Sequence, residues 1–526
     1  MTSSPRLAGL TVRDRWRRTR LRTYSATLTS IYHAASLRPE LWRATARGYH
    51  PAFDRIAARH ALLACRLGSV DIPAYRDLLL RNGLLLENGR MRARGLAGFP
   101  ETSKQNYAGC YDEASRCPAG RMHRPGVVVD ESSGSTGRPY NWVRGPQELK
   151  AIHRNIAGYV SLVFPGERLF VINAYSMGAW ATGTTTGNAL SRIAMVKNTG
   201  PDLEKIVDTL AHFGPDYDYI LTAYPPFLKH LRDRLDTAGF DWERYRLRAM
   251  VGGEGMTEAL RDYLEERFEQ VRSGYGASDL TIGIAAETDF TVWLRKQLAA
   301  DRDLRRELLA AGEQRLPMIF HYNPLETYLE VNGRGEIVCT INPSTCLQPK
   351  LRYNVGDEGM LLSARRVEAL IARAPGRRAG CRAGHERMKL PLLLVFGRKD
   401  STISYMGANL YPQDVEYGLY AGNPLAAEIA RFSLSLAELP GLEFRPVVNI
   451  ELRPGADLDA DGMARLAACC RDGVLAHLTR VSRDFAESLA EDPAAADLQV
   501  RVFPHGEGPF GAPAAIKNVY LTKGTT

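Results

Sequence analysis

The stretch from residue 219 to residue 268 constrains the fold most strongly, because apolar runs alternate there with helical patterns. Residues 219–223 predict a buried strand, and Pro225 then opens a helix with its leucines on one face. Residues 247–251 predict a second strand, and residues 257–268 a second helix. Alternation of this kind predicts an α/β fold with a largely parallel sheet flanked by helices.

The regions on either side have other textures. Residues 1–100 predict a helical leader, in which an arginine-rich run over residues 13–22 indicates a basic surface helix. A targeting segment or an anion-binding arm is the alternative for that run, which lacks the apolar core of a secretory signal. Residues 287–320 predict a charged helical insertion, and residues 365–389 a basic surface excursion.

The last part of the chain predicts a separate unit. With 526 residues, about two to four domains are expected. A strand over residues 447–452, a helix over residues 463–475 and alternating apolar residues near residue 500 indicate a compact α+β domain. We therefore expect a large N-terminal domain over residues 1–396 and a small, mobile C-terminal domain over residues 397–526.

Charge and cysteine usage exclude several classes of protein. The net charge of +9 would suit nucleic acid, but the basic residues are spread along the chain and interleaved with acidic ones. No apolar run approaches the roughly 18–20 residues that cross a bilayer. The eight cysteines form no C-x-x-C pair, and Cys381 with His385 has no second pair beside it, so zinc is not expected. A reducing, cytoplasmic compartment fits best.

Residues 132–139 are the first stretch that suggests chemistry, a loop of serines, glycines and a threonine after three valines. Glycine permits close backbone approach, and successive N–H groups and hydroxyls can hold phosphate oxygens. Arg138 adds charge-assisted donors, although the loop is not a Walker sequence. Taken alone, such a loop is more often a plain flexible turn.

Collinear motifs give the loop more weight. Together they resemble the adenylate-forming superfamily, most closely its phenylacetate–CoA ligase branch. In that family a Ser/Thr/Gly loop ending in Lys-Pro contacts the β- and γ-phosphates, and Arg138 stands here in place of the lysine. Residues 99–104 resemble the family's early P-x-x-x-K segment, and residues 72–76 also have a counterpart. Residues 251–254 resemble the segment that lines the adenine pocket.

The later motifs complete the resemblance. Residues 275–279 match Y-G-x-[ST]-E, in which the aromatic ring stacks on adenine and the acid helps to bind Mg²⁺. Asp279 stands in place of the usual glutamate, and because its side chain is one methylene shorter, its contact with the metal could require a bridging water. Asp357 ends a match to R-Y-x-x-G-D and would accept hydrogen bonds from both ribose hydroxyls. Residues 397–400 resemble G-R-x-D, and residues 407–416 match G-x-N-x-[FY]-P-x-x-[IV]-E.

The resemblance implies a set of functional residues. The nucleotide-binding set is Ser132, Ser133, Gly134, Ser135, Thr136, Gly137, Gly253, Glu254, Tyr275, Gly276, Ser278, Asp357 and Arg398. The catalytic set is Thr136, Arg138, Asp279 and Lys517, with Thr136 and Asp279 also holding the metal and Asp400 at the hinge between the domains. Lys523 competes with Lys517 for the role of the C-terminal lysine. The acyl pocket would draw on Tyr175, Met177, Gly178, Trp180 and Tyr224, although aromatic residues at such positions are more often plain core.

The implied activity is ATP-dependent conversion of an aromatic or otherwise apolar carboxylic acid into its acyl-adenylate. Pyrophosphate leaves, and the acyl group passes to coenzyme A. Transfer to an amine or a carrier-protein thiol is the alternative, and a nucleotide-binding homologue without catalysis is a third interpretation. The expected ligands are ATP, Mg²⁺ and coenzyme A, without zinc because residues 282–290 carry no cysteine. The expected partners are the acid and its acyl acceptor, with no nucleic acid or membrane; a homodimer is left open.

Overall fold

The structure is a computed structural model in which two compact units are recognised. It describes residues 12–35, 37–86, 88–131, 140–178, 181–253, 255–310, 313, 315–373, 388–398, 403–405, 408–439, 443–482, 485–486, 489 and 496–511. The first unit comprises Met1–Gly200, Gly274–Leu294 and Ile319–Val395. The second unit comprises Pro201–Ser273, Arg295–Met318 and Phe396–Thr526. The division predicted at residue 396 stays a prediction.

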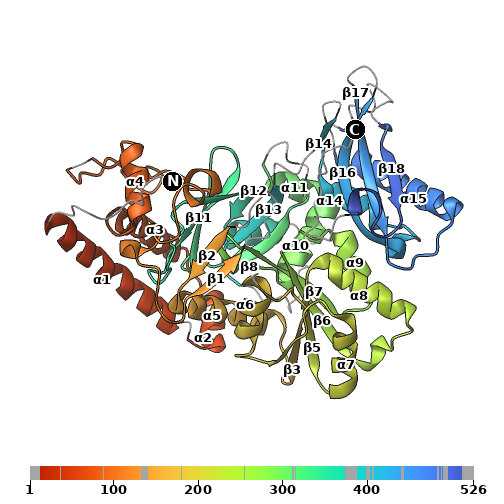
Figure 1. The fold of residues 1–526 in the computed structure, drawn as a ribbon, viewed down its shortest axis with the longest axis horizontal. Coiled ribbons are helices and arrows are strands. Elements are labelled where there is room, and N and C mark those ends of the chain that lie inside the picture. The colour runs from red at the N-terminus through yellow and green to blue at the C-terminus, as the bar shows by residue number, and fades with distance from the viewer. Residues whose placement is uncertain are drawn as a thin grey trace. The chain divides into compact units, whose positions relative to one another are not determined.

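Helices open the first unit, as the spacing of apolar residues predicts. They are α1 (Val12–Ala35), α2 (Pro39–Arg47), α3 (Ala52–Asp71) and α4 (Pro73–Arg81). The arginine-rich run lies on α1, which packs against α3 (Figure 1). Arg18 and Arg22 on α1 both donate to the carboxylate of Asp71 at the end of α3, each at 2.7 Å. Part of the basic run therefore serves the packing of this helical layer.

Within the described residues, the largest sheet orders eleven strands as β10-β11-β12-β13-β9-β8-β7-β6-β5-β3-β4. Their bounds are β3 (Leu169–Asn173), β4 (Met195–Asn198), β5 (Asp218–Ala223), β6 (Arg246–Gly252), β7 (Gln270–Ala277), β8 (Thr281–Ala286), β9 (Met318–Tyr322), β10 (Thr327–Val331), β11 (Glu336–Ile341), β12 (Tyr353–Leu362) and β13 (Leu392–Arg398). The α/β fold class is confirmed. The sheet is mixed, since β3–β4 and β5–β6 are parallel pairs. By contrast, β7–β8, β8–β9, β10–β11 and β11–β12 are antiparallel.

The other elements of the first unit surround its strands. They are the hairpin β1 (Val128–Glu131) and β2 (Asn141–Arg144), and the helices α5 (Pro146–Val163), α6 (Ala181–Leu190), α10 (Asp289–Ala300, which continues beyond this unit) and α12 (Ala364–Ala372). Helix α12 occupies part of the stretch for which the sequence predicts a surface excursion, so that prediction is wrong over these residues. Residues 374–387 lie outside the described part of the chain.

The strand–helix alternation predicted over residues 219–268 is confirmed in the second unit. Its elements there are α7 (Leu203–Phe213), β5, α8 (Pro225–Thr237), β6 and α9 (Glu258–Glu265). Leu228, Leu231 and Leu235 on α8 are all buried. Helix α9 begins after Thr257, whose side chain accepts a hydrogen bond from Leu260, and it ends earlier than predicted. Helix α11 (Arg302–Leu308) follows in the predicted insertion.

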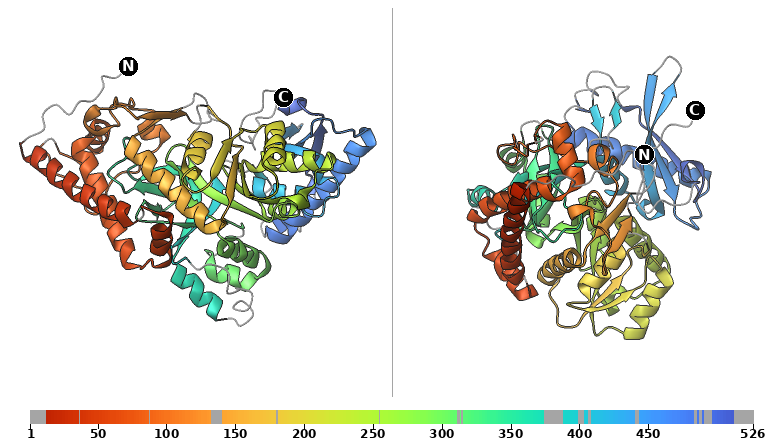
Figure 2. Two further views of the ribbon diagram at one scale, coloured as in Figure 1. Left: turned by 90° about the horizontal axis from the view of Figure 1, so that it is seen from below. Right: turned by 60° about the vertical axis from the view of Figure 1, so that its left-hand side comes forward.

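The C-terminal part of the second unit has a sheet of its own. It contains β16 (Ile429–Leu439), β17 (Glu443–Leu452) and β18 (Gln499–Phe503), with the short pair β14 (Ile403–Tyr405) and β15 (Ala408–Leu410). Helices α14 (Pro412–Tyr420) and α15 (Ala460–Val481) pack together beside it (Figure 2). Gly418 permits this close approach, because a Cβ there would lie 2.4 Å from the Cα of Val474. No helix among the described residues has the length and apolarity that a membrane crossing requires.

Candidate active site

A buried ion-pair network fixes the two strands that flank the phosphate-binding loop predicted at residues 132–139. The loop itself lies outside the described residues. Arg144 on β2 donates to Asp130 on β1 at 2.7 Å and to Glu148 on α5 at 3.3 Å. All three side chains are at most 5% exposed. The strand that enters the loop and the strand that leaves it are therefore held together by charge as well as by backbone pairing.

Arg144 also joins this hairpin to the turn that carries Asp279. Its guanidinium donates to the carbonyl oxygens of Ser278 and Leu280, at 2.7 and 2.8 Å. Asp279 lies between these two residues, in the turn from β7 to β8. A planar guanidinium with several donors suits this bridging position. Arg144 belongs to no recognised motif, so no sequence pattern marks it as a functional residue.

Asp279 is buried and has a partner on each carboxylate oxygen. The ammonium of Lys104 lies 3.0 Å from Oδ1, and the hydroxyl of Tyr353 donates to Oδ2 at 3.0 Å. Burial and then the charge of Asp279 raise the pKa of Tyr353, which keeps its hydroxyl protonated and able to donate. The structure therefore brings Asp279 together with Lys104. This lysine ends the segment over residues 99–104, to which the family resemblance assigns no function.

Backbone pairing explains how Lys104 reaches Asp279 from so far away in the sequence. Thr102 donates its N–H to the carbonyl of Arg352 at 2.9 Å and accepts from the N–H of Asn354 at 2.7 Å. These bonds align Thr102 with Tyr353 as an isolated parallel bridge. Thr102 and Arg352 belong to motifs that lie about 250 residues apart in the sequence. These hydrogen bonds join the two motifs into one local structure.

The residues expected to bind adenosine form a second pair in the same unit. Tyr275 on β7 donates its hydroxyl to Asp357 on β12 at 2.7 Å, and its ring lies 5.7 Å from that of Phe320. Gly276 is required by close packing, because a Cβ there would lie 2.9 Å from the carbonyl oxygen of Thr281. The structure therefore brings together the predicted adenine-stacking residue and the predicted ribose-binding acid.

Two predicted residues lie together in the second unit. Gly253 has a φ of +88°, and a Cβ at this position would lie 2.6 Å from the ring of Tyr224. The strand-to-helix turn after β6 therefore needs glycine both for its backbone conformation and for contact with this ring. Tyr224 is buried at 6% exposure, so its contact with a substrate stays a prediction.

The remaining predicted residues divide into two groups. In the first unit Tyr175 is buried just after β3, Met177 is partly buried, and Gly178 is exposed with a φ of +102°. Several predicted residues lie outside the part of the chain that the structure describes, namely Ser132, Ser133, Gly134, Ser135, Thr136, Gly137, Arg138, Trp180, Glu254, Asp400, Lys517 and Lys523. The backbone of Arg398 ends β13, and its side chain is likewise outside the description.

The donor set limits how a metal ion can bind. Among the described residues, no group of three His, Cys, Asp or Glu side chains is arranged to hold a metal. Asp279 alone would fit Mg²⁺ that arrives with ATP, because Mg²⁺ keeps several waters and needs only one or two carboxylates beside phosphate oxygens. Binding to Oδ1 requires the Lys104 ammonium to move away from it.

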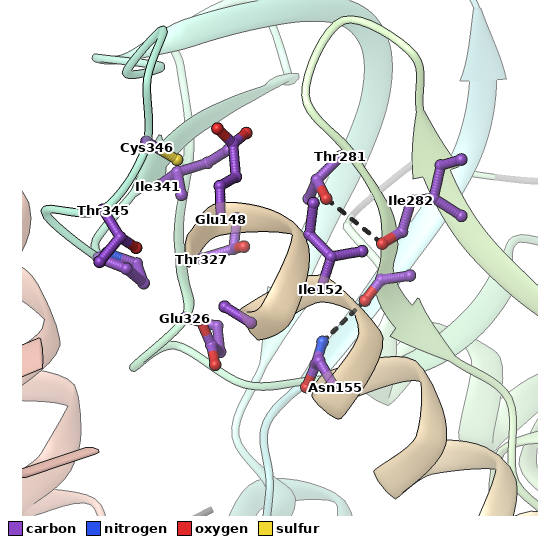
Figure 3. Close-up of a pocket in the computed structure, with 13 residues that line it drawn as sticks. Glu148, Ile152, Asn155, Thr281, Ile282, Glu326, Thr327, Ile341, Thr345 and Cys346 are labelled. Carbon is purple, nitrogen blue, oxygen red and sulfur yellow. Dashed lines mark hydrogen bonds between the residues drawn. The ribbon is translucent and has the colours of Figure 1, made fainter. Parts of the chain in front are cut away.

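A small cavity lies in the first unit, beside Glu148 (Figure 3). Its volume is about 30 Å³, which suits one water molecule and not a substrate. The lining includes Glu148, Thr281 and Glu326, whose side chains Figure 3 shows around the N-terminal part of α5. Burial raises the pKa of Glu326 to about 7, against the lowering effect of Arg154. This cavity is too small to be the acyl pocket.

Comparisons with known proteins identify the fold. No protein-family profile matches the chain, and no curated protein sequence is detectably similar. Solved structures of 2-hydroxyisobutyryl-CoA ligase are similar. Its postadenylation state with R3-HIB-AMP has 15% identity and a TM-score of 0.63, covering 91% of this chain and 92% of that chain.

Further structures of that ligase agree. The postadenylation complex with 2-HIB-AMP has 15% identity and a TM-score of 0.61, covering 90% of each chain. The thioesterification state with 2-HIB-AMP and CoA has 14% identity and a TM-score of 0.52, covering 91% of each chain. At this identity the similarity establishes the fold alone. The chain has the adenylate-forming fold over nearly its whole length.

Proposed function

We propose that this protein uses ATP to convert a carboxylic acid into its acyl-adenylate and then passes the acyl group to coenzyme A. One observation carries the proposal, in a chain with the adenylate-forming fold. In the first unit, Tyr275 on β7 pairs with Asp357 on β12, and Asp279 in the turn after β7 pairs with Lys104. Arg144 ties that turn to the strands flanking the loop. These are the groups that adenosine and its phosphates require.

The chemistry needs positioning and charge stabilisation more than covalent help from the protein. A carboxylate oxygen of the acid attacks the α-phosphorus of ATP. The bond from that phosphorus to the bridging oxygen breaks, and pyrophosphate leaves with the electron pair. The thiol of coenzyme A then attacks the acyl carbon, AMP departs, and the thiol proton passes to solvent. Fixed donors around the phosphates lower the barrier because they need no reorganisation during the reaction.

Each end of the candidate site has a defined task in this proposal. Tyr275 would support the adenine ring and Asp357 would accept from the ribose hydroxyls. Lys104 and Arg138 would hold phosphate oxygens, and Lys517 would stabilise the pentavalent centre. Mg²⁺, when bound by Asp279 and Thr136, would neutralise charge on the leaving pyrophosphate.

The acceptor and the acid are the finer parts of the proposal. The phenylacetate–CoA ligase-like type of activity, an aromatic or apolar acid and a cytoplasmic setting rest on the sequence motifs, the residues near Tyr175 and the cysteine usage. Transfer to an amine or to a carrier-protein thiol is the alternative.

A homodimer is also proposed, because α1 exposes Trp16, Tyr24 and Ile31. Light scattering would test it, with a monomeric mass as the contrary result.

The test begins with acid-dependent exchange of labelled pyrophosphate into ATP, measured across aromatic, fatty and amino acids. Exchange with one class of acid supports adenylation, and its absence across the whole panel contradicts it. The accepted acid is then incubated with ATP and either coenzyme A or a set of amines. A thioester supports the main proposal. An amide without a thioester assigns the protein to the alternative.

A further inference from the structure

Strand β12 is irregular at the place where it carries Asp357. The register between β11 and β12 shifts there, so that residues 355–357 of β12 lie opposite the single residue Ile337 of β11. A bulge of this kind bends a strand and changes the direction of the side chains within it. The carboxylate of Asp357, which accepts from the hydroxyl of Tyr275, therefore takes its direction from the bulge.

The side chain of Asn354 closes the bulge from within the same strand. Its Oδ1 accepts a hydrogen bond from the N–H of Gly356 at 2.8 Å. Gly356 has a φ of +84°, a left-handed conformation that favours glycine. This hydrogen bond fixes the backbone one residue before Asp357, so the direction of the carboxylate depends on the Asn354 amide.

Two carboxylates set the orientation of that amide. The Nδ2 of Asn354 donates to Glu336 at 2.7 Å and to Glu101 at 3.2 Å. An amide nitrogen only donates and an amide oxygen only accepts, so Nδ2 must face the carboxylates while Oδ1 faces the N–H of Gly356. Both amide hydrogens are used, and one orientation of the side chain satisfies all of these partners.

The turn between β10 and β11 holds the two carboxylates in place. Asn332 in this turn donates its Nδ2 to Glu101 and to Glu336, at 3.0 Å each. The guanidinium of Arg334 lies 2.7 Å from Glu336 and 3.5 Å from Glu101. Hydrogen bonds from Arg334 and Asn332 lower the pKa of Glu336 to about 2, so this carboxylate is ionised near neutral pH. The Asn354 amide therefore has a charged and well-fixed acceptor.

We propose that Asn354 is a positioning residue that aims the carboxylate of Asp357 at the ribose hydroxyls of ATP. The inference rests on the proposed function and adds to its nucleoside end a residue that does not itself touch the nucleotide. Glu336 and Glu101 orient the amide, and the amide holds the N–H of Gly356. No motif marks Asn354, because it occupies a variable position of R-Y-x-x-G-D.

Backbone hydrogen bonds hold the strand on both sides of the bulge without this side chain. Before the bulge, the N–H of Asn354 donates to the carbonyl of Thr102 at 2.7 Å. After it, the N–H of Gly359 donates to the carbonyl of Gly335 at 2.9 Å. Removing the side chain of Asn354 should therefore loosen residues 355–357 and leave the rest of β12 in place.

Calorimetric titration with ATP and with 2′,3′-dideoxy-ATP tests the inference in N354A, in N354D and in the control N332A. We expect N354A to bind ATP about three- to tenfold more weakly, because the ribose loses a well-placed acceptor. The dideoxy analogue, which lacks the hydroxyls concerned, should bind within about twofold of wild type. N354D sets a third carboxylate against Glu336 and Glu101 and should lose the same preference for ATP. N332A removes a donor to the same carboxylates but lies outside the bulge, so it should keep the preference.

A double-mutant cycle with D357N shows whether Asn354 acts through Asp357. When D357N is already present, the carboxylate that the amide positions is gone. N354A should then weaken ATP binding by less than about twofold, whereas independent contributions would multiply.

Equal weakening for both nucleotides in a folded N354A would assign Asn354 a structural role and overturn the inference. So would effects of N354A and D357N that multiply, or an equal loss of preference in N332A. A preference for ATP retained in N354D also overturns it, and this result stays decisive if N354A does not fold. Failure of the proposed function has a different signature: wild type prefers ATP to the dideoxy analogue and N354A does not, but no acid supports pyrophosphate exchange.

Discussion

The two ends of the candidate site handle charge differently. At the end proposed for the nucleoside, half-buried Asp357 accepts from a neutral hydroxyl, that of Tyr275. At the phosphate end, buried Asp279 faces the cation of Lys104 at 3.0 Å. A neutral hydroxyl suits a ligand group that is itself neutral, whereas a lysine ammonium suits a polyanion. Substitutions at the phosphate end should therefore alter rate and stability, and those at the nucleoside end mainly affinity.

Removing the charge of Asp279 should have the largest effect. D279N keeps the size of the side chain but leaves Lys104 without its counter-ion and removes a metal ligand. We expect the turnover rate of pyrophosphate exchange at saturating ATP to fall about 100- to 1000-fold. D303N, at an aspartate with a 76% exposed side chain, is the matched control. A rate within threefold of wild type in D279N would contradict the expectation that substitutions at the phosphate end alter the rate.

Lys350 lies between β11 and β12 and is 6% exposed, and its ammonium has no ion pair among the described residues. Replacing it should therefore stabilise the protein. K350M should raise the free energy of unfolding by about 2 kcal/mol at pH 6, where the buried ammonium is charged in both folded and unfolded states. The folded pKa of about 7 lies below the ordinary 10.5, so the wild type gains stability as the pH rises between these values. The advantage of K350M should therefore shrink by pH 9.

Urea unfolding of both proteins at pH 6 and pH 9 measures this difference. A K350M protein that is less stable at pH 6, or a difference that does not change with pH, would contradict an unpaired buried cation at this position.

A smaller effect is expected from Asp357 at the nucleoside end. D357N loses the charged acceptor for the ribose hydroxyls, so KM for ATP should rise about tenfold while the turnover rate stays within threefold. The preference for ATP over 2′,3′-dideoxy-ATP should largely disappear, because the analogue lacks the hydroxyls concerned. If D357N retains that preference, Asp357 does not contact the ribose.

Tyr275 should give the smallest change. Y275F keeps the ring and removes the hydroxyl that donates to Asp357. We expect a two- to fivefold rise in KM for ATP, in line with about 0.5–1 kcal/mol for a neutral hydrogen bond. A large loss of turnover in Y275F would show that the two ends are not independent, and the comparison would need revision.

The sequence predicts the nucleoside end better than the phosphate end. Tyr275 and Asp357 stand in motifs that can be recognised without knowing the fold, and the structure places them 2.7 Å apart. Arg144 stands in no motif, and its contacts come from segments that meet only in the folded chain. Local patterns cannot show that Arg144 reaches the carbonyls of Ser278 and Leu280.

The same reasoning explains which parts of the fold were predictable. The alternation over residues 219–268 carries its periodicity in the local sequence, and β5, α8, β6 and α9 follow it. The antiparallel half of the sheet depends on register between strands, as in β10–β11 and β11–β12, which short apolar runs do not specify. Helix α12 was missed because basic and glycine-containing residues follow it directly.

The most direct test of the central claim follows oxygen atoms from the acid into AMP. The acid that supports pyrophosphate exchange is prepared with ¹⁸O in both carboxylate positions and incubated with ATP and the acyl acceptor. Attack on the α-phosphorus predicts AMP that carries one ¹⁸O atom, detected by mass spectrometry, together with unlabelled pyrophosphate. AMP without the label, or label in inorganic phosphate together with ADP, would contradict acyl-adenylate formation.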